Sequence, residues 1–319
     1  MQVLKSQVPT GPADIVALGE PLIEFSQIKG EPTYRFGFGG DTSNFAIAAA
    51  RVGARTAYLS RVGDEPFGRA LLNLWNREGV DCSAVELDTE APTGIYFISY
   101  DGSGHHFSYR RTGSAATRMQ LNEGFVAAIR SARWLHVSGI TQAISTQACD
   151  TALQAMALAR EAGVRVSYDL NFRPRLWPAA RAAAIARASL AYTDLFLPSI
   201  DEAQTVLGVG SAQALVDWAL AQGARAVAVK RGELGACVST GQNLVDIPAW
   251  PVQAVDATGA GDCFGGVTVA RLLAGDDLAT AARAGAVAAA LATRGFGAID
   301  PLPRWPDIAE CLGGHSRPW

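Results

Sequence analysis

Residues 255–270 read VDATGAGDCFGGVTVA, and this stretch decides how the rest of the chain is interpreted. Gly259, Ala260 and Gly261 carry small side chains or none, so the backbone there can approach a ligand closely. The apolar run that follows predicts a helix, whose first N–H groups lack intrahelical partners and whose dipole favours an anion. Asp262 lies in the first turn of that helix. The stretch therefore predicts an anion site beside a carboxylate that holds a metal or removes a proton.

Two common phosphate-binding motifs do not fit this stretch. A dinucleotide fingerprint needs Gly-x-Gly-x-x-Gly after the first strand, whereas the spacing here is Gly-x-Gly-x-x-x-Gly near the carboxyl end of the chain. A Walker A loop needs Gly-Lys-Ser/Thr, which does not follow. The alternative without a ligand is a tight helix start with a capping aspartate, although the density of glycines argues against it.

The composition is typical of a soluble globular protein that buries a sizeable core. Of its 319 residues, 49% are hydrophobic and 18% are charged. The net charge of −3 gives no reason to expect a nucleic acid as partner, and no run of about 18 apolar residues could span a membrane. The five cysteines are scattered and odd in number, which argues against a disulfide framework or a zinc site and predicts a cytoplasmic location.

Short apolar strands alternate with helices along most of the chain. The clearest strands are expected over 14–18, 56–61, 134–137, 164–170, 194–197 and 225–230, and the helices over 43–52, 66–78, 146–161, 178–189, 200–207, 261–273 and 278–293. This order predicts an α/β fold, with a mostly parallel central sheet covered by helices on both faces. Such sheets bind ligands beyond the carboxyl ends of their strands.

One segment departs from this alternation. The β-prone runs 93–100 and 105–110 are joined by Asp-Gly-Ser-Gly and alternate apolar with polar residues, which predicts a half-exposed hairpin. We expect it to leave the main sheet, either as a lid over a site or as a contact between two copies of the chain.

Two motifs together resemble the signatures of the PfkB (ribokinase-like) carbohydrate kinases. They are DATGAGDCFGG at 256–266 and GGDTSN at 39–44. With the order of strands and helices, the resemblance covers residues 14–300, with a small β lid formed by excursions at about 20–38 and 92–112. Residues 301–319 would then be a C-terminal extension. The resemblance implies a ribokinase-like fold and phosphoryl transfer from ATP to a sugar hydroxyl.

The resemblance also assigns roles within the glycine-rich turn. Asp262 would be the base that accepts the proton of the sugar hydroxyl. After Gly259, the backbone amides of Ala260, Gly261 and Asp262 would form the anion hole for the moving phosphoryl group. Because phosphoryl transfer needs mainly positioning and charge stabilisation, a helix N-terminus and one carboxylate form a sufficient core.

On the metal side, the family usually has an Asn-x-x-Glu motif tied to Mg²⁺ and phosphate. Residues 199–202 read SIDE, so Glu202 matches the motif and Ser199 replaces the asparagine. A hydroxyl can still hold a metal-bound water, and we expect Glu202 to act on Mg²⁺ indirectly through water. The structural alternative is an acid favoured by the dipole at a helix start.

On the nucleotide side, KRGELG at 230–235 resembles the glycine loop of the family. The predicted nucleotide contacts are Ser199, Lys230, Gly232, Gly235, Gly259, Gly261 and Ala289. A solvated strand end and ordinary packing of alanine-rich helices would explain Lys230 and Ala289 equally well. Asp256 and Thr258 are candidates to fix the loop or to hold a monovalent cation.

Two further strings narrow the class of sugar. SYRRTGSAA at 108–116 and DLNFRP at 169–174 resemble the 2-keto-3-deoxygluconate kinase branch of the family. By this resemblance the substrate contacts are Gly40, Asn44, Tyr96, Tyr109, Arg111 and Arg173. The two arginines would lie nearest the acid group, because the planar guanidinium binds both oxygens of a carboxylate and a neutral hexose would not need two of them.

The sequence therefore predicts a kinase that uses ATP and Mg²⁺ to phosphorylate 2-keto-3-deoxygluconate at its terminal hydroxyl. The nearest alternative is a fructokinase or another PfkB sugar kinase. A NAD(P)-dependent oxidoreductase is less favoured, and the presence of Asp262 argues against a non-catalytic sugar-acid sensor. The partners expected are the sugar acid and ATP, without nucleic acid or membrane, and a homo-oligomer is left open.

Overall fold

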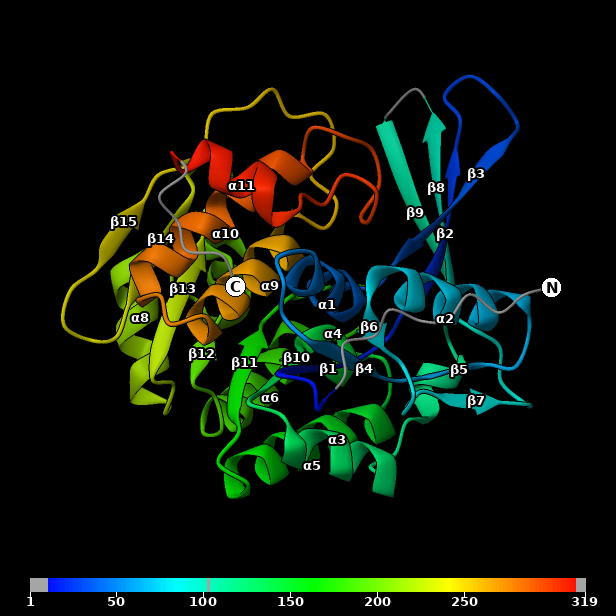
Figure 1. The fold of residues 1–319 in the computed structure, drawn as a ribbon, viewed down its shortest axis with the longest axis horizontal. Helices are drawn as coiled ribbons and strands as arrows, with labels where there is room; N and C mark the ends of the chain where they lie inside the picture. The colour runs from blue at the N-terminus through cyan, green and yellow to red at the C-terminus, as the bar shows by residue number, and fades with distance from the viewer. Residues whose placement is uncertain (1–10, 102–103, 314–319) are drawn as a thin grey trace.

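A nine-stranded sheet runs through the middle of the computed structural model, which describes residues 11–101 and 104–313 (Figure 1). Its strands are, in spatial order, β15 (Val245–Ile247), β14 (Ala236–Ser239), β13 (Ala226–Lys230), β12 (Leu195–Phe196), β11 (Arg165–Asp169), β10 (Trp134–Ser138), β1 (Ile15–Leu18), β4 (Thr56–Leu59) and β6 (Val80–Asp81). The pairs from β13 to β6 are parallel, and β14 and β15 add to the β13 edge antiparallel. The predicted α/β class is confirmed.

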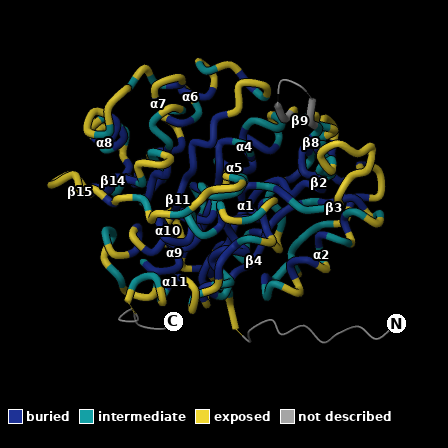
Figure 2. The backbone as a smooth tube through the Cα atoms, turned by 90° about the horizontal axis from the view of Figure 1, so that it is seen from above, coloured by how far each residue is buried: buried dark blue, intermediate teal, exposed yellow. Residues whose placement is uncertain are grey.

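The strands at the centre of this sheet are apolar on both faces. In β1, Ile15 and Ala17 pack in one hydrophobic cluster, while Val16 and Leu18 pack in the other. Because successive strand residues point to opposite faces, a continuous apolar run is what a doubly covered parallel sheet requires. Figure 2 shows the buried residues gathered along the middle of the molecule and the exposed ones on its periphery.

Helices cover the two faces of the main sheet. The first layer contains α1 (Asp41–Arg51), α2 (Pro66–Glu78), α9 (Ala260–Leu273), α10 (Leu278–Ala292) and α11 (Trp305–Cys311). The second contains α3 (Glu123–Ser131), α4 (Gly139–Ala143), α5 (Thr146–Glu161), α6 (Ala179–Leu190), α7 (Ile200–Leu207) and α8 (Ala212–Ala221). Short 3₁₀ turns lie at Ala115–Arg118 and Gly232–Leu234. Within the described part of the chain, no helix has both the length and the apolar character needed to cross a bilayer.

A second, smaller sheet stands apart from the main one at the upper right of Figure 1. Its order is β3 (Tyr34–Gly39), β2 (Leu22–Gln27), β8 (Ile95–Asp101) and β9 (Gly104–Arg110). The expected hairpin is present as β8 and β9, and it pairs through β8 with β2 rather than with the main sheet. Whether this sheet acts as a lid stays a prediction. A further two-stranded sheet joins β5 (Arg61–Gly63) to β7 (Glu86–Asp88).

The C-terminal segment packs onto the first helix layer. Leu302 and Ile308 are buried in the same cluster as α1, α9 and α10. The guanidinium of Arg271, on α9, lies 4.3 Å from the ring centroid of Trp305 at the start of α11. The part of the expected extension that the structure describes, as far as residue 313, is therefore joined to the core, and residues 314–319 lie outside the described residues.

Candidate active site

The glycine-rich turn becomes the N-terminus of α9. Gly259 caps the helix with a φ of 76°, a left-handed conformation that favours glycine, and a Cβ there would lie 3.1 Å from the carbonyl oxygen of Ala298. Asp262 lies in the first turn, as predicted. The N–H of Ala260 donates to the carbonyl of Ala257 at 3.2 Å. The amides of Gly261 and Asp262 are therefore the better placed of the three for an anion.

The second glycine motif meets the first through a hydrogen bond. The side-chain amide of Asn44 donates to Oδ2 of Asp262 at 2.9 Å. This is possible because α1 and α9 pack closely: a Cβ on Gly266 would lie 2.4 Å from the carbonyl oxygen of Phe45. The predicted start of α1 at residue 43 is wrong by two residues, because Gly40, with a φ of 110°, is its N-cap.

A buried network that the sequence analysis did not predict lies behind Asn44. Asp41, in the first turn of α1, accepts hydrogen bonds from the hydroxyl of Ser138 and from the side-chain amide of Asn171. Asn171 has a φ of 37°, which is unusual for a residue other than glycine, and its N–H donates to Asp169 at 3.1 Å. Backbone strain of this kind is concentrated at functional sites. The positive φ of Asn171 therefore marks this residue as part of the site, but only the structure reveals it.

Lys230 approaches the same place from the end of β13. Its ammonium group lies 2.5 Å from Oδ2 of Asp169, which ends β11. A Cβ on Gly261 would lie 3.4 Å from the Lys230 nitrogen, so the lysine is next to the first turn of α9. Ser199 forms an isolated parallel bridge with Lys230. The structure thus brings Ser199, Lys230 and Gly261 together beside Asp169. Their contacts with a nucleotide stay a prediction.

The electrostatic surroundings make Asp262 a stronger base than an ordinary aspartate. Burial and the nearby carboxylates of Asp41 and Asp169 raise the pKa of Asp262 to about 8, although Asn44 and Lys230 act in the opposite direction. A general base works best when its pKa is near the working pH. The raised pKa makes the ionised Asp262 a stronger proton acceptor than an ordinary aspartate, and its ionised fraction increases as the pH approaches 8.

The predicted sugar contacts of the small sheet lie next to each other. Tyr96 and Tyr109 are opposite residues of β8 and β9, with ring centroids 5.8 Å apart. The hydroxyl of Tyr96 donates to Glu24, a buried residue of β2. Gly39, at the end of β3, allows this packing, because a Cβ there would lie 2.6 Å from the Tyr96 hydroxyl.

Both arginines predicted to bind a carboxylate are paired with glutamates of the chain itself. Arg111 forms an ion pair with the buried Glu20. Arg173 lies 3.3 Å from Glu202, the predicted magnesium residue. Neither Glu20 nor Glu24 is among the site residues predicted from the sequence. The signal that could have found Glu20 is its position two residues after the first strand, at the carboxyl end of the sheet.

Among the described residues, no hydrogen bond or ion pair joins the predicted nucleotide residues Gly232, Gly235 and Ala289 to Asp262, Lys230 or Asp169. Gly232 and Gly235 shape the 3₁₀ turn after β13, and Ala289 is half-buried on α10. Asp256 accepts hydrogen bonds from the N–H and hydroxyl of Thr258, at 2.9 and 2.6 Å, and from the N–H of Gly297 at 2.9 Å. These bonds fix the loop, while the monovalent cation stays a prediction.

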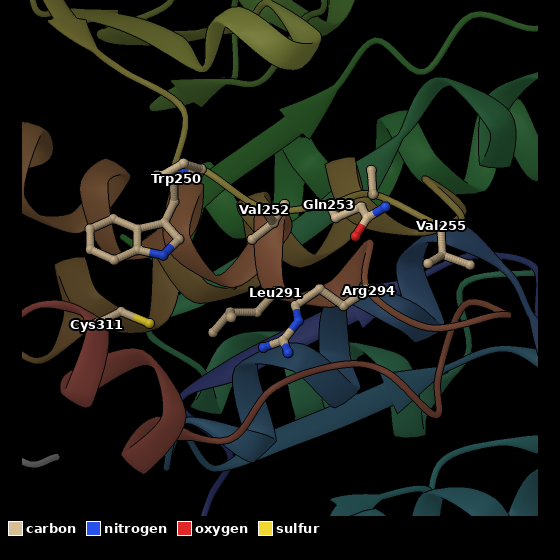
Figure 3. Close-up of a pocket in the computed structure, with 9 residues that line it drawn as sticks. Trp250, Val252, Gln253, Val255, Leu291, Arg294 and Cys311 are labelled. Carbon is tan, nitrogen blue, oxygen red and sulfur yellow. The ribbon is translucent and has the colours of Figure 1, made fainter.

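A cavity of about 530 Å³ lies elsewhere, between the segment before the turn and helices α10 and α11 (Figure 3). It is lined by Trp250, Pro251, Val252, Gln253, Ala254, Val255, Leu291, Arg294 and Cys311. None of the predicted catalytic, substrate or nucleotide residues lines it, so it is not the candidate site. Among residues 11–101 and 104–313, no three His, Cys, Asp or Glu side chains are grouped as metal ligands.

Comparison with known proteins points to one family. Residues 12–305 match the family described as pfkB family carbohydrate kinase. The chain is 34% identical to 2-dehydro-3-deoxygluconokinase of Thermoproteus tenax, over 93% of the chain and 94% of the relative, and 32% identical to 2-dehydro-3-deoxygalactonokinase of Haloferax volcanii, over 88% and 90%. Its fold is similar to that of a putative ribokinase II from E. coli in complex with ATP and Mg²⁺, with a TM-score of 0.85, 24% identity, and coverage of 95% and 100%.

Proposed function

The chain belongs to the pfkB family of carbohydrate kinases, and from this membership we propose that it transfers the γ-phosphoryl group of ATP to the terminal hydroxyl of 2-keto-3-deoxygluconate. The observation that carries the chemistry is Asp262 in the first turn of α9, hydrogen-bonded to Asn44. The similarity to a 2-dehydro-3-deoxygluconokinase over nearly the whole chain supports the substrate, since 2-dehydro and 2-keto name the same sugar acid.

In this proposal Asp262 accepts the proton of the sugar hydroxyl. The hydroxyl oxygen forms a bond to the γ-phosphorus while the bond between that phosphorus and the bridging oxygen of ATP breaks, and ADP leaves. Asn44 holds one carboxylate oxygen of Asp262, which fixes the direction of proton transfer. The amides of Gly261 and Asp262 then stabilise the negative charge on the moving group.

Lys230 supplies positive charge on the nucleotide side. Its ammonium group is next to Gly261 and is held by Asp169, so it can contact a phosphate that approaches the start of α9. Mg²⁺ neutralises phosphate charge when it is bound with ATP. Glu202 is the single carboxylate expected to act on Mg²⁺, and Glu202 is already paired with Arg173. These residues therefore fit an ion whose ligands are mainly phosphate oxygens and water.

A fructokinase is the second candidate, and one observation favours it. Arg111 and Arg173 each have a glutamate partner, so neither arginine presents an unbalanced positive charge to a substrate. A neutral sugar would therefore not need to supply a negative charge to balance these two arginines. A sugar acid, in contrast, would gain only from guanidinium N–H groups that the glutamates leave available.

A substrate panel with ATP decides between them. Purified protein would be assayed for ATP consumption with 2-keto-3-deoxygluconate, its galactonate epimer, fructose, ribose and adenosine. We expect the highest kcat/KM with one of the two keto acids. An equal or higher kcat/KM with fructose would replace this proposal by the fructokinase.

The five cysteines, all unpaired, support the cytoplasm as the location of the enzyme.

A further inference from the structure

We propose that Glu20 is a positioning residue that gives the site its selectivity for an acid sugar, by fixing the guanidinium of Arg111. The inference rests on the proposed function, because it concerns how the acid group of the substrate is bound. Glu20 lies two residues after β1, at the carboxyl end of the main sheet, whereas Arg111 follows β9 of the small sheet. The ion pair between them is thus a side-chain link between the two sheets.

The Glu20 carboxylate has little freedom to move. Its side chain is fully buried, and its second oxygen accepts a hydrogen bond from the hydroxyl of Ser114 at 3.3 Å. A Cβ on Gly94 would lie 3.2 Å from the same oxygen, so the β7–β8 connection closes over the carboxylate. Gly40 packs against the Glu20 backbone, because a Cβ there would lie 2.5 Å from its carbonyl oxygen. The carboxylate is therefore a fixed point to which Arg111 is attached.

Arg111 in turn keeps part of its hydrogen-bonding capacity unused. Its side chain is only 10% exposed, and its Nε is buried without a hydrogen-bond partner among the described residues. The guanidinium carbon lies 5.3 Å from the ring centroid of Tyr109, which restrains the group from another side. Because a buried N–H without a partner is costly, an acceptor brought by the substrate would be favoured at this position.

The pairing also explains how the site can bind an acid without an exposed positive charge. Glu20 balances the charge of Arg111, so the pair presents oriented N–H groups instead of a mobile cation. Orientation distinguishes a carboxylate, which has two acceptor oxygens, from a single hydroxyl. Loss of Glu20 would leave the charge of Arg111 in place but allow the side chain to change its orientation.

The test compares Glu20→Ala with wild type on an acid and a neutral substrate. We expect the kcat/KM for 2-keto-3-deoxygluconate to fall roughly 10- to 100-fold, the range that one charge-assisted hydrogen bond supports, while kcat/KM for fructose and KM for ATP stay within a factor of two to three. The same loss should be measured in the affinity for the keto acid without ATP, by calorimetry. In the double variant Glu20→Ala/Arg111→Ala, the loss should be no larger than in Arg111→Ala alone, because both act through one group.

Two further variants keep the test decisive. Glu20→Gln keeps the size of the side chain and one acceptor oxygen, so we expect a smaller decrease in kcat/KM for the keto acid. This variant takes the place of Glu20→Ala if Glu20→Ala does not fold. Asp14→Asn alters a carboxylate paired with Arg55 at the opposite end of β1 and should leave the ratio of the two kcat/KM values unchanged.

The outcomes separate this inference from the proposed function. If wild type shows no preference for the keto acid, the proposed function fails and the selectivity role of Glu20 fails with it. The other case is that wild type prefers the keto acid but the Glu20 variants lower kcat/KM for both substrates by the same factor, or the loss in the double variant equals the sum of the two single losses in free energy. Only the inference on Glu20 is then overturned.

Discussion

Asn44 and Asp262 are 218 residues apart in the chain, yet the amide of the first donates to the carboxylate of the second at 2.9 Å. The bond joins the two glycine-rich motifs, one at the start of α1 and the other at the start of α9. It leaves one oxygen of Asp262 in a fixed direction and keeps the carboxylate next to the amides that the helix start exposes. The proposed base and the proposed anion site therefore lie in one turn of structure.

Replacing Asp262 by asparagine should remove the base and little else. We expect Asp262→Asn to lower kcat by about 100-fold or more, the usual contribution of a general base, while the affinities for ATP and sugar change little. Steady-state kinetics and calorimetric titration of each substrate would measure the two effects. Near-normal turnover would falsify the assignment of Asp262 as base, and lost affinity for both substrates would indicate a structural role.

The pH dependence of the reaction should reflect the raised pKa of Asp262. Burial and the charges of Asp41 and Asp169 raise this pKa to about 8, and only the ionised carboxylate can accept a proton. The kcat/KM of the wild type should therefore fall as the pH drops below 8. In Asp41→Asn one of the raising charges is gone, so the fall should begin at a lower pH. An acidic limb at the ordinary position of an aspartate in the wild type would contradict the assignment.

Local pattern was enough to predict six strands of the main sheet, seven helices and the hairpin, because each depends on residues that are near in sequence. It did not predict α3, α4, α8 or α11. The clusters at the site depend instead on strand order. β10 lies between β1 and β11, and this brings Ser138 and Asn171 to the same carboxylate oxygen of Asp41. Periodicity contains no information on which strands are neighbours, so these contacts could not be predicted. Glu20, Asp169 and Lys230 all follow or end strands of the main sheet, a position that could have been searched as a class.

Arg173 should contribute to sugar binding more than to nucleotide binding. Its side chain is 47% exposed and its pair with Glu202 spans 3.3 Å, so the pair is weak enough to open for a substrate carboxylate. Arg173→Ala is expected to raise KM for the keto acid far more than KM for ATP in steady-state kinetics. Arg187→Ala, which removes an exposed arginine in the last turn of α6, is the matched control and should leave both KM values unchanged. Equal increases in the two KM values in Arg173→Ala would show that Arg173 supports structure instead.

Arg51, at the end of α1, should be a main contributor to stability. It makes two hydrogen bonds to Glu78, both of 2.9 Å, and donates to the carbonyls of Ile299 at 3.0 Å and Leu302 at 2.5 Å. Arg51→Met leaves these acceptors without their donor, and removing one partner of a buried pair costs about 3–5 kcal/mol in the free energy of unfolding. Urea denaturation followed by circular dichroism would measure the loss.

The comparison for Arg51 is Arg55, which is more exposed and pairs with Asp14. Arg55→Met should lower the free energy of unfolding much less, and a similar decrease in both variants would contradict the special role of Arg51.

The pH dependence of stability gives a second check. Although burial acts to raise it, hydrogen bonding and charge from Arg51 hold the pKa of Glu78 below its ordinary value of 4.5. A lowered carboxylate pKa contributes stability that is lost as the pH falls through the folded-state value. The difference between wild type and Arg51→Met should therefore narrow in acid, below pH 4.5.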